Sequence, residues 1–414
     1  MRRLDHDARL KTFYMNFMAE YLELQHMVPA ASSTSSIQYF LPHYGVLKED
    51  NNNFKIRVVF NGSKPTCSGL SLNDIMHTGL KLLVNIFDVL ISSSQHRLIF
   101  ITDVTKMYRQ IVVHEKDQSL QQILWFDEEG NIIPFKLTTV TYGTKSAPLL
   151  AVRSLLQLVG DEGHRFPLTI DPLTKGRYVD DISGGADDLE SLQAVADDIE
   201  GLCMAGGFPL AKWASNHRKL LQLNRAEAIT QYKIEDPEVS TKILGMYWSS
   251  NKDQFSFKHS PPCSTQPCTR GAILSEIAQI FDPLGFLSPL IIQAKMFMQE
   301  LWLVKLGWDT PLSVELRQKW ISFKTQLNMI DIIKIPRCIH WSTNSALEIH
   351  GFSDASQLAM AAVVFIKVLP TTRTQRAKDR LLCSNCILIS DFCRIFWNFK
   401  IISKSYHFLG TSKN

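Results

Sequence analysis

The sequence predicts an α+β fold in which a sheet is backed by helices on one face. Between residues 98 and 213 the predicted elements follow the order strand, helix, hairpin, helix, strand. Acids stand at two of the central strands: Asp103 ends the apolar run 98–102, and the pair Asp180-Asp181 follows two β-forming residues. Hairpins interspersed with helices favour this fold class over a parallel α/β sheet.

The N-terminal part predicts a helix and then a hairpin. Residues 8–27 form one amphipathic helix by their apolar spacing, carried by Leu10, Phe13, Tyr14, Phe17, Met18, Tyr21 and Leu22. A small polar linker, 30–36, precedes two strands, 37–46 and 54–60, around a polar turn.

Two cations alternate with apolar residues in the second of these strands. Lys55 and Arg57 therefore fall on one face of the strand. This arrangement suits a triphosphate, because arginine can bond two oxygen atoms at once. A solvated edge strand defended by charge explains the pattern equally well.

The next elements are a helix, a buried strand and a second hairpin. Residues 74–91 show helical periodicity, and the continuous apolarity of 98–102 predicts a strand buried on both faces. Strands 120–126 and 132–140 flank a polar turn, and a helix follows from Ser146 to about residue 159.

The stretch Tyr178-Val179-Asp180-Asp181 predicts a short hairpin with both acids at its tip. Two carboxylates held together repel each other unless a cation lies between them, so a divalent ion is the natural ligand. Two other Asp-Asp pairs, 187–188 and 197–198, belong to a predicted helix and are interpreted as a helix-capping pair and a solvated pair.

The C-terminal part predicts a third hairpin, helices and a few strands. The hairpin joins strands 242–248 and 254–257, and a linker follows at 261–267. Residues 269–306 are mainly helical with breaks at 282–285 and 288–289, and 312–329 form another helix. Extended segments follow at 349–354 and 361–366, and the strand pattern decays beyond Lys367.

Composition limits the class of protein. A chain of 414 residues predicts two or three domains, and 45% hydrophobic with 20% charged residues indicates a globular protein. The net charge of +4 is compatible with a phosphate-bearing partner. Eight scattered cysteines and a charged N-terminus predict a reducing compartment and no secretion. No apolar run approaches the length that a bilayer requires.

The acids Asp103, Asp180 and Asp181 provide the ligands that two-metal catalysis requires. Two divalent ions about 3.5–4 Å apart would stabilise the attacking and the leaving oxygen of an in-line phosphoryl displacement. Magnesium prefers such carboxylate ligands over imidazole or thiolate.

An ordered set of motifs resembles the reverse transcriptase region of BEL/Pao retrotransposon polyproteins. Tyr178-Val179-Asp180-Asp181 matches the polymerase signature, and the other matching segments are 57–63, 69–74, 103–110, 142–148, 206–213 and 273–289. Together they cover about residues 5–366 in the family's order. The resemblance implies a polymerase right hand with fingers, thumb and an antiparallel palm sheet backed by helices.

This resemblance also implies roles for individual residues. Asp103, Asp180 and Asp181 would bind two Mg²⁺ ions, with Mn²⁺ as a substitute. The remaining roles would be triphosphate binding for Arg57 and Lys55, exclusion of the ribose 2′-hydroxyl for Tyr108, close approach of the nucleotide for Gly143, and protonation of pyrophosphate for Lys212. As isolated residues, the last three would be interpreted as a packed ring, a turn and a surface charge.

The resemblance implies a division of the chain as well. Residues 1–30 would be an N-terminal helix, 31–240 the fingers and palm, and 241–340 the primer-grip hairpin, thumb and connection. Residues 341–366, with Asp354 as first metal ligand, would begin a ribonuclease H domain. The tail 367–414 diverges, and its acids Asp379 and Asp391 do not restore the set that such a domain requires. Its cysteines 383, 386 and 393 lack a fourth zinc ligand at suitable spacing.

Two hypotheses follow for function. The first is an RNA-directed DNA polymerase that extends a primer on RNA or DNA with deoxynucleoside triphosphates. The second is a truncated, catalytically silent relic that binds nucleic acid without turnover. A magnesium nuclease or cyclase would leave the motifs at Arg57, Gly143 and Lys212 unexplained. The resemblance implies cytoplasmic virus-like particles, nuclear entry, and no membrane partner. The capsid, protease and integrase of such polyproteins have no counterpart in this sequence.

Overall fold

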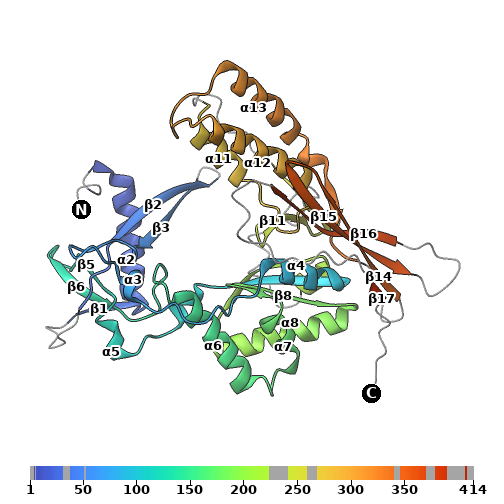
Figure 1. Cartoon of the computed structure of the whole chain (residues 1–414). Helices are drawn as coiled ribbons and strands as arrows, with labels where there is room; N and C mark the ends of the chain where they lie inside the picture. The colour runs from blue at the N-terminus through green and yellow to red at the C-terminus, as the bar shows by residue number, and fades with distance from the viewer. Residues whose placement is uncertain are drawn as a thin grey trace. The chain divides into compact units, whose positions relative to one another are not determined.

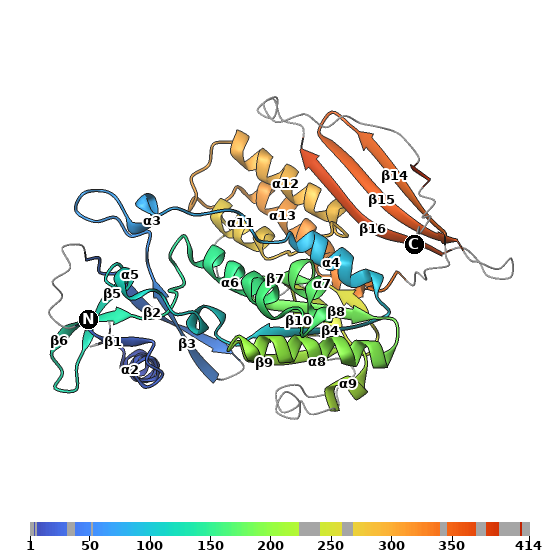
Figure 2. The ribbon, with the colours of Figure 1, turned by 90° about the horizontal axis from the view of Figure 1, so that it is seen from below.

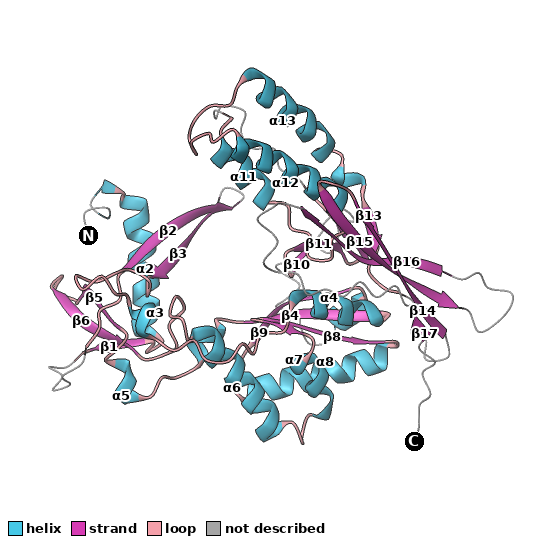
Figure 3. Cartoon of the chain, in the orientation of Figure 1, coloured by secondary structure: helices cyan, strands magenta, loops and turns pink. Residues whose placement is uncertain are grey.

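The computed structural model describes residues 4, 6–30, 38–50, 53–222, 241–258, 268–339, 346–369, 378–388 and 406–407 (Figure 1). Helices and several small, mostly antiparallel sheets alternate in this part of the chain (Figure 3). The chain divides into two compact units. Unit 1 comprises Met1–Val84, Asp103–Ile182 and Asp197–Ala211, and unit 2 comprises Asn85–Thr102, Ser183–Ala196 and Lys212–Asn414.

In unit 1, helix α2 (Ala8–Glu23) is shorter than the predicted helix 8–27. It begins where the Asp7 carboxylate accepts a hydrogen bond from Leu10 N at 2.9 Å. It ends at Leu24, because the next residue, Gln25, has a left-handed φ of 56°. Strand β1 (Met27–Pro29) then pairs with β6 (Ile132–Leu137).

Both hairpins predicted in unit 1 are present, but the first strand lies at 43–50 and not at the predicted 37–46. Strand β2 (His43–Asp50) pairs along its whole length with β3 (Asn53–Phe60), and β5 (Gln122–Phe126) pairs with β6. The apolar face of α2 packs on these strands and forms one core. Its buried members include Leu10, Tyr14, Met18, Tyr21, Val58, Phe60, Trp125 and Phe135.

The predicted helix 74–91 is wrong in its extent. Helix α3 (Leu72–Ile75) is closed by a Ser71–Asp74 capping box, and Met76 already has extended backbone. Gly79 has a φ of 76°, which interrupts any helix at that point. A second helix, α4 (Ile86–Gln95), starts in unit 2 at the cap Asn85.

A four-stranded sheet has the order β7-β8-β4-β9. Its strands are β4 (Leu98–Val104), β7 (Arg177–Tyr178), β8 (Asp181–Ala186) and β9 (Leu210–Ser215). Strand β4 is buried at every position except Asp103, as its apolar run predicts. The helices α6 (Ala147–Glu162) and α8 (Leu189–Ala205) lie where the sequence predicts them.

Short helical segments connect these elements: η1 (Met107–Gln110), α5 (Glu115–Gln118), η2 (Pro167–Thr169), α7 (Ile170–Thr174) and α9 (Arg218–Gln222). The Asp188 carboxylate accepts hydrogen bonds from the backbone and hydroxyl of Ser191, each at 2.8 Å, so this acid caps the start of α8 as predicted.

In unit 2, a second sheet corrects the third predicted hairpin. Its order is β10 (Thr241–Ile243), β11 (Met246–Ser249), β12 (Gln254–Ser256) and β13 (Lys334–Pro336). The predicted strand 242–248 is therefore two strands. Leu244 and Gly245 both have positive φ, 46° and 83°, and turn the chain between them.

Three helices of unit 2 share a core around Trp320. They are α11 (Arg270–Ala278), α12 (Ser288–Leu303) and α13 (Val314–Leu327), followed by η3 (Ile330–Ile332). Helices α12 and α13 lie side by side in both views (Figure 2). The predicted break at 282–285 is present between α11 and α12. At this break the Asp282 carboxylate accepts hydrogen bonds from the backbone N–H groups of Phe286 and Leu287, at 2.9 and 2.6 Å.

The last sheet extends past Lys367, where the sequence predicts that the strand pattern ends. Its order is β16 (Lys378–Leu388), β15 (Ala359–Leu369), β14 (Ala346–Ala355) and β17 (Tyr406–His407). Strand β16 has little apolar alternation, and its pairing with β15 defines it. Asp391 and Cys393 lie outside the described residues. No helix in the described part of the chain is long and apolar enough to cross a membrane.

Candidate metal and nucleotide site

The three predicted metal ligands lie on neighbouring strands within unit 1. Asp103 is the penultimate residue of β4, Asp180 lies in the β7–β8 turn, and Asp181 begins β8. A backbone hydrogen bond of 2.9 Å from Val104 N to Asp180 O joins the end of β4 to this turn. The backbone thus brings the three aspartates together at one end of the two central strands, β4 and β8.

The β7–β8 turn has only two residues, Val179 and Asp180, because Tyr178 pairs directly with Asp181. Val179 has a φ of 56°, which a β-branched residue rarely adopts. Such strain persists only where neighbouring groups hold it, and it is common at functional sites.

Arg177 is one group that holds this turn. Its side chain is buried, its Nη1 donates to Val179 O at 3.4 Å and its Nε to Leu173 O at 3.1 Å. Burial lowers the pKa of the Arg177 guanidinium. Arg177 thus binds backbone carbonyl oxygens on both sides of its own position, at Leu173 and at Val179.

Carboxylate oxygens suit Mg²⁺ chemically. Among the described residues, however, no three His, Cys, Asp or Glu side chains are close enough together to hold a metal ion. The backbone places the three aspartates side by side, while their carboxylates do not converge on one point. Metal binding would require these carboxylates to come together, and a cation between them would offset the repulsion of their like charges.

Tyr108 belongs to the short helix η1, which follows β4 directly. Its side chain is half-buried. Burial and then the negative charge of Asp180 raise the pKa of the Tyr108 hydroxyl. The residue predicted to exclude the ribose 2′-hydroxyl therefore lies within reach of the charge of Asp180, a predicted metal ligand.

Lys55 and Arg57 are exposed on the same face of β3, as predicted, while Val58 is buried. The charge of Arg57 acts on the hydroxyl of Tyr142, the residue before Gly143. Gly143 has a φ of 95°, and a Cβ there would lie 2.0 Å from the carbonyl oxygen of Phe60. Packing against β3 is thus sufficient to require a glycine, and its role toward a nucleotide stays a prediction.

The remaining predicted residues, Lys212 and Asp354, belong to unit 2. Lys212 is exposed in β9 with a φ of 56°. Asp354 lies in β14 opposite Ala361, whereas Asp379 of β16 lies opposite Lys367. Six residues of strand correspond to about 20 Å. Asp379 therefore does not join Asp354 in a metal site.

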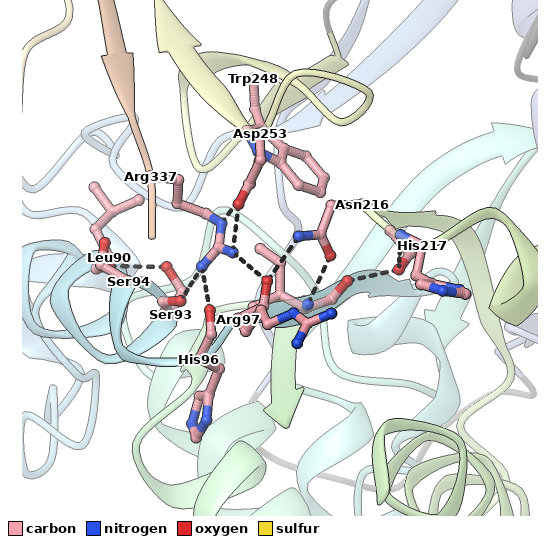
Figure 4. Close-up of polar contacts among 12 residues, drawn as sticks. Leu90, Ser93, Ser94, His96, Arg97, Asn216, His217, Trp248, Asp253 and Arg337 are labelled. Carbon is pink, nitrogen blue, oxygen red and sulfur yellow. Dashed lines mark hydrogen bonds and ion pairs between the residues drawn. The ribbon is translucent and has the colours of Figure 1, made fainter. Parts of the chain in front are cut away.

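A second buried arginine, Arg337, was not apparent from the sequence (Figure 4). Its guanidinium bonds both carboxylate oxygens of Asp253, at 2.7 and 2.8 Å. It also donates to the carbonyl oxygens of Ser93, His96 and Arg97 at the C-terminal end of α4. Nothing in the sequence pairs position 337 with positions 93–97.

The loop before α12 joins the helices to the last sheet within unit 2. Ser384 N donates to Leu284 O at 2.9 Å, and the Ser384 hydroxyl donates to Gly285 O. A Cβ at Gly285, whose φ is 74°, would lie 1.7 Å from Ser384 O. The loop before α12 and strand β16 are therefore in direct contact.

The comparison with protein families agrees with this packing. Residues 269–386 match the family model described as the Pao retrotransposon-like RNaseH-like domain. The match begins within the predicted thumb and connection, before residue 341, and continues past Lys367 through most of β16. No curated protein matches the chain. The region 269–386 is thus similar to the ribonuclease H-like domain of Pao retrotransposons, which supports an origin in a Pao/BEL retrotransposon polyprotein.

Proposed function

We propose that the chain is an RNA-directed DNA polymerase of a retrotransposon, with its active site at Asp103, Asp180 and Asp181. The observation that carries this proposal is the backbone hydrogen bond between Val104 and Asp180, which brings the end of β4, with Asp103, next to Asp180 in the β7–β8 turn and Asp181 at the start of β8. Residues 269–386, which follow these acids in the chain, match a Pao retrotransposon domain. This match is consistent with a retrotransposon polymerase in the preceding part of the chain.

In this proposal each residue has a chemical task. Asp103, Asp180 and Asp181 hold two divalent cations, which when bound lower the pKa of a primer 3′-hydroxyl and neutralise phosphate charge. Arg57 and Lys55 bind the triphosphate oxygens. Tyr108 excludes a ribose 2′-hydroxyl by its bulk, and Lys212 gives a proton to the departing pyrophosphate.

The second candidate is a silent relic that binds primer and template without turnover. Two observations favour it: the described residues contain no ready cluster of metal ligands, and Asp379 lies far along the sheet from Asp354. The relic would retain the exposed cations of β3 and would bind nucleic acid with a strong dependence on salt.

Extension of a labelled DNA primer on poly(rA) with Mg²⁺ distinguishes the two candidates. We expect the unmodified chain to extend the primer and Asp180→Asn to reduce the rate by about a hundredfold or more, because a metal ligand is lost. Asp188→Asn is the matched control, since asparagine also caps a helix. Equal rates for Asp180→Asn and the unmodified chain would remove the metal assignment, and no extension by either would favour the relic.

A further inference from the structure

The turn that carries Tyr108 is attached to the N-terminal helix by a buried arginine. Arg109, the next residue in η1, is 7% exposed. Its Nη2 donates to Glu20 Oε1 at 3.0 Å, and its Nε donates to His26 Nδ1 at 2.9 Å. The guanidinium also lies over the Tyr21 ring, 4.3 Å from its centroid. All of these groups belong to unit 1.

Glu20 holds the turn at two places. Besides Arg109, its Oε1 accepts a hydrogen bond from Lys106 Nζ. Lys106 immediately precedes η1 and has a left-handed φ of 51°. A non-glycine residue keeps such a conformation where its surroundings fix it. Glu20 thus accepts hydrogen bonds from the side chain of the residue that precedes η1 and from that of the residue after Tyr108.

The charges around Arg109 suit a fixed attachment. The pKa of Glu20 is lowered: burial opposes the shift, but the hydrogen bond from Lys106 and the charge of Arg109 outweigh it. Burial, followed by the charges of Arg109 and Lys106, lowers the pKa of His26 and keeps its Nδ1 available as an acceptor. The carboxylate and the neutral imidazole are both in the forms that receive hydrogen bonds from Arg109.

We propose that Glu20 and Arg109 are positioning residues that set the place of Tyr108 and thereby the discrimination between deoxy- and ribonucleoside triphosphates. This inference rests on the proposed polymerase function. Tyr108 lies between Lys106 and Arg109 in a single turn of helix, so a shift of either attachment shifts the ring. A shift of a fraction of an ångström in a group that excludes a hydroxyl changes selectivity more than it changes the chemical step.

The inference is tested by Glu20→Gln, which keeps the side-chain length and one acceptor oxygen but removes the charge. Primer extension gives kcat and KM for a deoxy- and for a ribonucleoside triphosphate. We expect the ratio of the two kcat/KM values to fall about tenfold, with kcat for the deoxynucleotide changed by about threefold or less. Glu300→Gln is the matched control, because Glu300 is also a partly exposed acid bonded to a lysine, Lys319, at 2.6 Å.

A double-mutant cycle with Tyr108→Ala separates positioning from general stability. If Glu20 acts through the tyrosine, Glu20→Gln changes the selectivity ratio of the unmodified chain but not that of Tyr108→Ala. Equal changes in both backgrounds, or an unchanged ratio in an active Glu20→Gln protein, would overturn the inference. Failure of the proposed function is distinct, because the unmodified chain would then incorporate no nucleotide. Thermal unfolding of each variant verifies folding.

Discussion

The buried Arg337 guanidinium provides the sharpest stability prediction. The side chain of Arg337 is 0% exposed, and it neutralises Asp253 while binding three carbonyl oxygens at the end of α4. Arg337→Met keeps most of the volume but leaves the carboxylate and these carbonyls without their donor. Removing one partner of a buried ion pair costs about 3–5 kcal/mol. We therefore expect the free energy of unfolding of unit 2 to fall by about that amount.

Urea unfolding followed by tryptophan fluorescence measures this change, because Trp248 Nε1 donates to Asp253 at 3.0 Å and reports on the same site. Lys319→Met is the control: it breaks a solvent-exposed ion pair with Glu300, so its loss of stability should be much smaller than that of Arg337→Met. The double variant Arg337→Met with Asp253→Asn should be no less stable than Arg337→Met alone, since no charge is left buried and asparagine tolerates the left-handed φ of 50° at this position. A loss for Arg337→Met as small as that for Lys319→Met would refute this reasoning.

Three further predictions concern single positions. Gly143→Ala should destabilise the chain by about 2–5 kcal/mol, because the new Cβ adds backbone strain and clashes with a carbonyl oxygen of β3. Gly69→Ala should cost only about 1–2 kcal/mol, because its Cβ meets open space. The urea midpoints of the two variants compare these losses, and equal losses would contradict the clash at Gly143. Burial lowers the pKa of His43 from its ordinary 6.5, so the unfolded chain takes up a proton at higher pH than the folded chain does. The free energy of unfolding should therefore decline as the pH falls below 6.5, and His43→Gln should flatten this decline. An equal slope in both proteins would show that His43 is not the source of the pH dependence. Burial raises the pKa of the Cys203 thiol to about 12, whereas Cys67 is exposed. Iodoacetamide should therefore alkylate Cys67 before Cys203 in the native protein, as followed by mass spectrometry. Equal alkylation rates of the two cysteines would contradict the fold.

Local patterns predict the strands and the turn of the candidate site well. The apolar run before Asp103 gives a buried strand, and the β-formers before Asp180 give the predicted short hairpin, although only Asp180 lies in its turn and Asp181 already begins β8. Both features depend on neighbours in the sequence. The positive φ of Val179 was not predicted, because contacts such as the bond from Arg177 help to hold it.

Contacts between distant residues account for what the sequence could not predict. Glu20 looks like a solvated residue on the polar face of α2, and nothing near it indicates that Arg109 is its partner. The helical periodicity of 74–91 and the β-propensity of 242–248 were both misleading, because Gly79 and Gly245 turn the chain within them. Strand β16 depends on pairing with β15, and its own pattern does not predict it.

Binding of Mn²⁺, followed by electron paramagnetic resonance, tests most directly whether Asp103 of β4, Asp180 of the β7–β8 turn and Asp181 of β8 act together. The unmodified chain should bind Mn²⁺, and Asp103→Asn and Asp181→Asn should each weaken binding by about tenfold or more, since each removes a charged ligand. Asp188→Asn, at the cap of α8, should leave binding unchanged. Equal affinity in all four proteins would contradict a metal site at this end of β4 and β8.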